Sequence, residues 1–436
     1  MRDVFVFILI FGTIPFILKR PAYGVMVFAW LSLMNPHRLT YGAAYDFQFA
    51  LMISVLTVFS MLKSREPKMI PKLPVLVVLA CFIAWMTFTT FFANEQVRAW
   101  AEWERVIKEM VMIFITIAVL NTERDVKLFA WVVGLSLGFY GAKGGIFTIT
   151  SGGTSRVLGP PDSYITDNND IALALLTTVP LIWYLSLQAP RKWIRYGLLA
   201  LACLTITAAA GSYSRGALLA GAAMLSMLWL RNKNKVRTAL VLLALVGAVY
   251  ALMPEKWFGR MNTIGEYKSD ASANGRLNAW QFAYNIASDS LAGGGYRTFT
   301  PRMFQIYAPN PHDVHAPHSI YFQVMGEHGF IGLALYLVFL FLVWRTGTRI
   351  VRFCRDKPEL KWASDLASMS QVSMIGFMAG GAFLSLAYFD LLYDIMVLLV
   401  AMEKLLMYKQ KKPSVLPEQV PASADGLAIP ARVPPR

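Results

Sequence analysis

Residues 318–344 read HSIYFQVMGEHGFIGLALYLVFLFLVW, and this stretch decides the fold class. A helix that crosses a bilayer needs about 20 predominantly apolar residues, and this run is longer than that. A basic stretch, RTGTRIVRFCR at 345–355, follows it directly. Only helices and closed barrels satisfy their backbone polar groups in lipid. The stretch therefore predicts a transmembrane helix.

Apolar runs of this kind recur along most of the chain. The sequence is 56% hydrophobic and 15% charged, whereas a soluble domain carries about 25% charged residues. We therefore expect an all-α polytopic membrane protein with about twelve to thirteen transmembrane helices. The expected spans are 4–18, 22–34, 47–62, 74–92, 104–120, 126–149, 171–188, 194–210, 216–230, 237–253, 318–344, 370–388 and 391–408.

Four segments follow from this pattern. Residues 1–253 carry transmembrane helices joined by short loops, and residues 254–317 form one large loop. Loops of this length are usually functional, and this one contains a helical pattern of its own, NGRLNAWQFAYNIAS, with Asn274 as its expected N-cap. Residues 318–408 form the C-terminal transmembrane helices. Residues 409–436, rich in Pro, Ala and Val, are expected to be a disordered cytoplasmic tail.

Two kinds of loop alternate along the chain. The basic set is 19–20, 63–72, 191–195, 231–237, 345–361 and 409–412, with 121–127 included by position. The set poor in Lys and Arg is 35–46, 93–103, 150–170, 211–215, 254–317 and 389–390. The positive-inside rule places the first set in the cytoplasm and the second set, with the large loop, on the outer side of the membrane. The net charge of +15 then reflects membrane orientation, so we expect membrane lipids and no nucleic acid as partners.

Four of the five histidines lie between residues 312 and 328. Spacing of three residues would let imidazoles share a metal on a helix face. Pro311 and Pro317 break the segment, however, and Asp313 is the one carboxylate within the triplet. We therefore expect no metal. His312 and His315 are expected in a loop, and His328 in a packed helix interior.

His318 is the histidine with a distinct position. Pro317 suits the first turn of a helix, so we expect His318 in the opening turn of the span. The positive end of the helix dipole favours a neutral imidazole there, and a neutral imidazole can act as a general base. The alternative is an interfacial histidine that only caps the span.

Three arginines belong to the predicted outer loops. Arg215 lies in GSYSRGALLAG, Arg276 in SANGRLNAW and Arg156 in GGTSRVLGPPDSY. A guanidinium is suited to bidentate hydrogen bonds with phosphate, and Gly216 and Gly275 beside the first two would leave room for a ligand. The alternative is that these side chains reach the membrane interface without binding anything.

An acidic group of three residues, Asp162, Asp167 and Asp170, occupies the loop before the span 171–188. These carboxylates would either bind sugar hydroxyls or cap the next helix.

Taken together, these motifs resemble the O-antigen ligase and polymerase superfamily of bacterial envelope glycosyltransferases. The pattern H-[NSQ]-x9-G-x-x-G stands here as His318-Ser319 and Gly329-Phe330-Ile331-Gly332. SRGA with Arg215, and GR…W with Gly275, Arg276 and Trp280, carry the rest of the resemblance, together with a large loop late in the chain. The N-terminal third, including LSLMNPHRLTYG at 31–42, is similar to O-glycosylation ligases associated with exosortases.

This resemblance implies a GT-C-like enzyme at the outer face of the bacterial inner membrane. It would transfer a glycan en bloc from undecaprenyl diphosphate to a lipid A–core hydroxyl, with inversion and with no cofactor or metal. His318 would be the catalytic base, and Arg215 and Arg276 would bind the diphosphate. Arg156, His315 and Tyr321 are further candidates for substrate binding.

Two alternatives remain at this point. The acceptor of the same donor would instead be a protein or a growing polysaccharide. A transporter is less favoured, because its ionisable groups should lie near the bilayer midplane, whereas here they cluster at the outer ends of spans.

Overall fold

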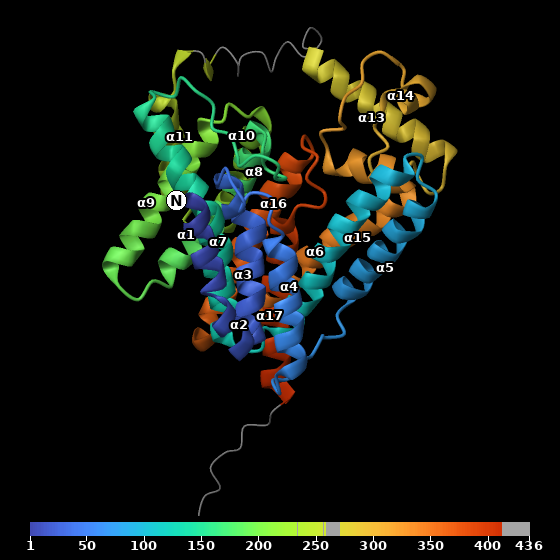
Figure 1. Cartoon of the computed structure of the whole chain (residues 1–436). Helices are drawn as coiled ribbons and strands as arrows, with labels where there is room; N and C mark the ends of the chain where they lie inside the picture. Colours follow the sequence, from blue (N-terminus) through green and yellow to red (C-terminus); the bar gives the residue numbers. More distant parts are fainter. Residues whose placement is uncertain (233, 256, 259–270, 412–436) are drawn as a thin grey trace, which may run out of the picture.

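The computed structural model describes residues 1–232, 234–255, 257–258 and 271–411, in which the regular elements are all helices. Figure 1 shows a bundle in which α13 and α14 pack over one corner, beside α15. The α-helices are α1 (Arg2–Phe11), α2 (Ile14–Lys19), α3 (Pro21–Met34), α4 (Phe49–Lys63), α5 (Pro74–Phe91), α6 (Gln96–Val119), α7 (Glu123–Thr150), α8 (Asn168–Leu187), α9 (Lys192–Ala210), α10 (Arg215–Arg231), α11 (Lys235–Leu252), α13 (Ala271–Asp289), α14 (Pro301–Tyr307), α15 (Ile320–Cys354), α16 (Lys361–Gly381) and α17 (Asp390–Lys411). Two short 3₁₀ helices are η1 (Pro36–Leu39) and η3 (Pro358–Leu360).

Among the described residues, 5 helices are long and apolar enough to cross a membrane: α5, α7, α8, α9 and α15. The helices α3 and α4 are apolar but shorter. The predicted all-α polytopic membrane protein is therefore confirmed. This criterion does not establish the other expected spans as transmembrane, so the count of twelve to thirteen stays a prediction. Of the expected tail, residues 409–411 belong to α17, and residues 412–436 lie outside the described part.

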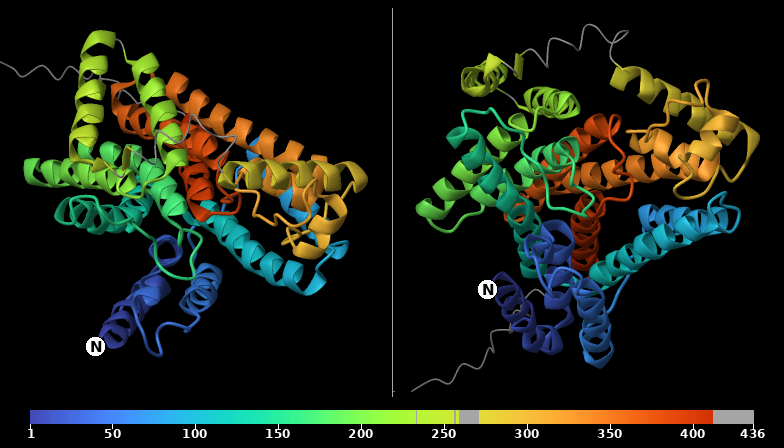
Figure 2. Two further views of the ribbon diagram at one scale, coloured as in Figure 1. Left: turned by 90° about the horizontal axis from the view of Figure 1, so that it is seen from above. Right: turned by 45° about the horizontal axis from the view of Figure 1, so that its top comes forward.

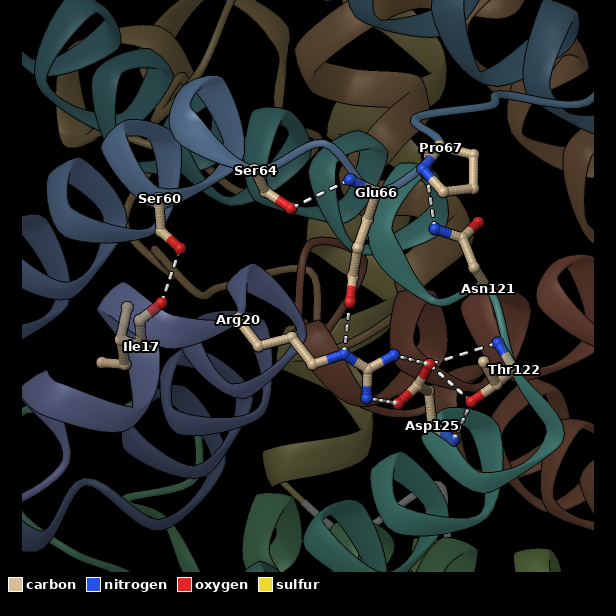
Figure 3. A network of polar contacts seen from close by, with 9 residues as sticks. All are labelled: Ile17, Arg20, Ser60, Ser64, Glu66, Pro67, Asn121, Thr122 and Asp125. Atoms are coloured by element: carbon tan, nitrogen blue, oxygen red, sulfur yellow. Dashed lines mark hydrogen bonds and ion pairs between the residues drawn. The ribbon is translucent and has the colours of Figure 1, made fainter.

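Arg20 joins three segments at one end of the bundle (Figure 3). Its Nε donates to Glu66 Oε1 at 2.8 Å, and its two terminal nitrogens donate to the Asp125 carboxylate at 2.7 and 2.9 Å. The Asp125 side chain is 0% exposed and forms a capping box with Thr122 at the start of α7. A buried carboxylate is thus fully bonded between the α2–α3, α4–α5 and α6–α7 connections. We call this the Arg20 end.

Further bonds gather the predicted basic loops at the Arg20 end. Asn121 Nδ2 donates to the Pro67 carbonyl at 2.6 Å. Lys404, near the end of α17, donates to Asn121 Oδ1 at 3.0 Å. Several predicted basic segments therefore meet here, as their assignment to one side of the membrane predicts. They are loops 19–20, 63–72 and 121–127 and the C-terminal part of α17.

Loops of the other set contact one another at the opposite end, which we call the His318 end. Arg38 lies 3.8 Å from the Asp162 carboxylate, and the Asn94 amide donates to the Gly294 carbonyl at 2.9 Å. Arg297 pairs with Glu102 at 2.7 Å. These contacts join loops 35–46, 93–103, 150–170 and 254–317. The predicted alternation of loops between two ends is observed here; which end faces the cytoplasm stays a prediction.

The span that follows His318 is interrupted. Gly329 has φ 68° and ψ −173°, a region that glycine alone adopts readily. The turn at 291–296 docks on this break, because Gly294 and Gly295 donate to the carbonyls of Gly326 and Glu327 at 2.9 and 2.8 Å. The prediction of one continuous helix over 318–344 is therefore wrong: a short helix precedes Gly329 and a long one follows it.

Candidate active site

Helix α13 holds the loop that leads to His318. Asn278 Nδ2 donates to the carbonyls of Asn310 and Asp313 at 2.8 and 2.9 Å, and Asn278 Oδ1 accepts from the Asn310 amide at 2.9 Å. Trp280 Nε1 donates to the Pro317 carbonyl at 2.7 Å, and its ring stacks on Phe322 with centroids 4.7 Å apart. Residues 310–317 are thus fixed to α13 by the side chains of Asn278 and Trp280.

Two expectations about α13 change. The helix already includes Ala271, so Asn274 lies inside it and is not its N-cap. The space beside Gly275 is also occupied, because a Cβ on Gly275 would lie 2.4 Å from His315 Cδ2. The missing side chain of Gly275 therefore makes room for the His315 ring and not for a ligand. Gly275 directly precedes Arg276.

His318 lies before the helix and not in its first turn. Its φ is 41°, in the left-handed region, and Ser319 is the N-cap, with its side chain accepting from the Phe322 amide. The predicted helical position of His318 is therefore wrong, and the reason is that serine is among the preferred N-cap residues. A non-glycine residue in this region costs on the order of 1–3 kcal/mol and persists only where its surroundings enforce it. The Trp280 bond before His318 and the Ser319 cap after it supply that enforcement.

The half-buried His318 ring is surrounded by charged groups from three segments. Burial lowers the pKa of His318, the positive charges of Arg276 and His315 lower it further, and the negative charge of Asp167 opposes them. Burial and the charge of Arg276 thus both favour the neutral imidazole at pH 7.

Arg215 is the first residue of α10 and is half-buried. Ser214 caps that helix by accepting from the Ala217 amide at 3.2 Å, and Tyr213 before it has φ 63°. Asn168 Nδ2 donates to the Ser212 carbonyl at 2.7 Å. Since Asn168 follows Asp167, whose charge acts on His318, the start of α8 connects the Arg215 segment to the His318 segment.

The remaining candidates divide between these surroundings. Arg156 is exposed. Burial raises the pKa of the Tyr213 hydroxyl, and the charge of Arg156 lowers it by a smaller amount. Arg156 therefore lies near the Arg215 segment. His315 belongs to the Arg276 neighbourhood, with Nδ1 3.2 Å from Asp313 Oδ1. The Tyr321 hydroxyl instead donates to the Met378 carbonyl on α16 at 3.0 Å. Within the described ranges, no group of three or more His, Cys, Asp or Glu side chains is arranged to hold a metal ion.

Two residues affect His318 in ways that the sequence does not predict. Asp167 caps α8 through the Asn169 amide at 2.8 Å, which confirms the capping alternative, yet it also acts on His318. Trp280 was noted only as part of a motif, and its bond to Pro317 spans 37 residues. A cap has a local sequence signal, whereas a contact between distant loops has none.

Two family models match the chain. Residues 1–189 match a family of unknown function, DUF5935. Residues 198–337, which include Arg215, Arg276 and His318, match the O-antigen ligase family. No curated protein matches the sequence. Residues 198–337 are thus similar to the O-antigen ligase family, and this similarity supports glycosyl transfer of the ligase or polymerase type by this multi-pass membrane protein.

Proposed function

We propose that the protein is an O-antigen ligase of the bacterial inner membrane, with its active site facing the periplasm. It transfers a glycan en bloc from undecaprenyl diphosphate to a sugar hydroxyl of lipid A–core. The observation that carries the proposal is the neighbourhood of Arg276 and the neutral His318 within the residues that match the O-antigen ligase family. One group supplies fixed positive charge and the other accepts a proton.

In the proposed reaction, the acceptor hydroxyl oxygen attacks the anomeric carbon of the donor glycan. Its proton passes to the His318 imidazole as the new C–O bond forms. The bond from the anomeric carbon to the diphosphate breaks on the opposite face, and undecaprenyl diphosphate leaves with the electron pair. The anomeric centre is therefore inverted.

Arg215 and Arg276 serve the leaving group. Negative charge grows on the diphosphate as its bond to the sugar breaks, and guanidinium groups held in place stabilise that charge most in the transition state. Arg215 is held by the cap of α10, and Arg276 by α13. Arg156 and His315 would contact more distant parts of the donor, and Tyr321 would do so least directly, given its bond to α16.

The test is transfer in proteoliposomes that contain a defined undecaprenyl-diphosphate glycan, with lipid A–core and a protein acceptor supplied separately. Glycan on lipid A–core supports a ligase. Glycan on the protein, or a lengthened lipid-linked glycan, would identify the protein-directed transferase or the polymerase instead.

His318→Ala should lower the rate by roughly 10²–10⁴, as loss of a general base does. His312→Ala is the matched control, because His312 is an exposed histidine of the same loop. Equal transfer by the two variants would refute the assignment of His318.

A further inference from the structure

A groove of about 770 Å³ opens in the part of the chain that matches the family of unknown function. Its walls are α3, α4 and α6, and the start of α17 adds Phe389 and Asp390. Figures 1 and 2 show α6 running obliquely to α4. The candidate residues for glycosyl transfer do not line this groove.

Much of the groove lining is a hydrocarbon surface. Leu51, Val55 and Val111 line it and are 43%, 60% and 51% exposed. The groove follows α6 from Ala101 to Ile115, which at ~1.5 Å per residue is roughly 21 Å. One leaflet of a bilayer with a hydrocarbon core of ~30 Å is about 15 Å deep. The groove is therefore long enough for a lipid chain and its head group.

The outer part of the groove carries ordered polar groups of both kinds. The Tyr45 hydroxyl donates to Asp162 at 2.6 Å, and Arg38 lies 3.8 Å from the same carboxylate. The Arg105 guanidinium lies 3.7 Å from the centre of the Tyr164 ring. Donors, acceptors and an aromatic ring thus lie together at the mouth of an apolar channel.

The lining carries charged groups of both signs. The cations are Arg38, Arg105 and Lys108, and the acidic side chains are Glu104, Glu109, Asp162 and Asp390. Glu109 and Asp390 are buried and hydrogen-bond to each other, so the mouth of the groove offers guanidinium donors together with the Asp162 and Glu104 acceptors. A neutral head with many hydroxyls can both donate to carboxylates and accept from guanidinium groups.

Two lining side chains have buried polar atoms that lack a hydrogen-bond partner within the described residues: His37 Nδ1 and Glu109 Oε2. Burial, with a smaller contribution from Arg38, lowers the pKa of His37 to about 4, so the ring is neutral at pH 7. Buried polar atoms without partners are uncommon, and a sugar hydroxyl can donate to Glu109 Oε2.

We propose that this groove binds a glycolipid, with the hydrocarbon chain between α4 and α6 and the sugar head at Arg38, Arg105 and Asp162. Its use as the site of a lipid-anchored acceptor rests on the proposed function. The loop 159–167 supports that use, because Asp162 lines the groove while Asp167 acts on His318. Asp167 is five positions after Asp162, so their backbones are at most about 18 Å apart.

The test uses the full chain in nanodiscs and three photoactivatable lipids with identical diazirine-bearing acyl chains. Their head groups are diglucosyl, phosphoglycerol and phosphoethanolamine, and labelled peptides are located by mass spectrometry. The diglucosyl lipid should label the α4 and α6 peptides at least about tenfold more than the other two. Equal labelling by all three would mean ordinary membrane lipid and would overturn the proposal. Preference for phosphoglycerol would overturn it as well.

Val55→Trp fills the channel and should lower diglucosyl labelling at least fivefold. Val77→Trp is the matched control, because Val77 on α5 is also 60% exposed but lies outside the groove. Val111→Trp repeats the test from the α6 side, so a single misfolded variant does not decide it. The His318→Ala protein should be labelled by the diglucosyl lipid as strongly as the unmodified protein, although it has lost transfer. This result separates lipid binding in the groove from the proposed transfer reaction. Normal transfer by a Val55→Trp protein that has lost labelling would overturn the acceptor role.

Discussion

Trp280 donates its indole N–H to the carbonyl oxygen of Pro317 at 2.7 Å, and so ties helix α13 to the residue that precedes His318. The same indole stacks on Phe322 at 4.7 Å, one helical turn beyond His318. One side chain of the large loop thus contacts the chain on both sides of the proposed base. Trp280 is therefore a positioning residue for His318 in the proposed reaction.

Trp280→Phe tests this role, because phenylalanine keeps an aromatic ring against Phe322 and removes only the donor. We expect kcat to fall about tenfold, which corresponds to ~1.4 kcal/mol in the activation free energy, with the KM for the lipid-linked donor unchanged. Trp193→Phe is the control, since Trp193 is 67% exposed on α9. A Trp280→Phe enzyme with full kcat would show that the bond to Pro317 does not position the base.

The charges around His318 predict opposite pH effects in two variants. His318 must be neutral to accept a proton, so activity falls as the pH drops through its folded-state pKa, which lies below 6.5. Asp167 raises that pKa and Arg276 lowers it. The acidic limb of kcat against pH should therefore move to lower pH in Asp167→Asn and to higher pH in Arg276→Gln.

Asparagine is as good an N-cap as aspartate, so Asp167→Asn should leave the melting temperature of the protein unchanged. This separates a charge effect from loss of the α8 cap. If both variants kept the acidic limb of the unmodified enzyme, the titrating group would not be His318.

How much the sequence predicts depends on the distance along the chain over which a feature is determined. Apolar length predicts helices, and the Lys and Arg distribution predicts which loops share an end of the bundle, because both are local properties. For His318 two local signals compete. Pro317 predicts that His318 lies in the first turn of the helix, but Ser319 is the better cap, and the helix begins after it. The approach of Asp167, Arg276 and His315 to His318 joins α8, α13 and the loop before α15, and no local pattern carries that information.

Gly329 is a position where the fold requires glycine. A Cβ there would lie 2.4 Å from the Leu291 carbonyl oxygen, and the backbone conformation is strained for any other residue. We expect Gly329→Ala to reduce the free energy of unfolding by about 3 kcal/mol or more, or to prevent folding, because the turn at 291–296 can then no longer pack against the break in α15. Thermal unfolding in detergent and membrane yield measure this.

Gly197→Ala is the matched control for Gly329→Ala. Gly197 lies inside α9, and a Cβ there meets nothing within 4 Å. Its replacement should be neutral or stabilise the helix by up to ~1 kcal/mol. Equal melting temperatures for the two variants would show that the break in α15 tolerates a side chain.

The Arg20 network predicts the largest stability effect at the opposite end of the bundle (Figure 3). Arg20→Ala leaves Asp125, which is 0% exposed, without its bidentate partner. Removing one partner of a buried ion pair costs about 3–5 kcal/mol, because the other charge stays buried and uncompensated. We therefore expect a clear fall in the melting temperature, whereas Lys127→Ala, which breaks the partly exposed Lys127–Glu123 pair, should change it little.

Adding Asp125→Asn to Arg20→Ala removes the uncompensated charge and should restore part of the loss. A double variant no more stable than Arg20→Ala alone would show that packing, and not the buried charge, accounts for the effect.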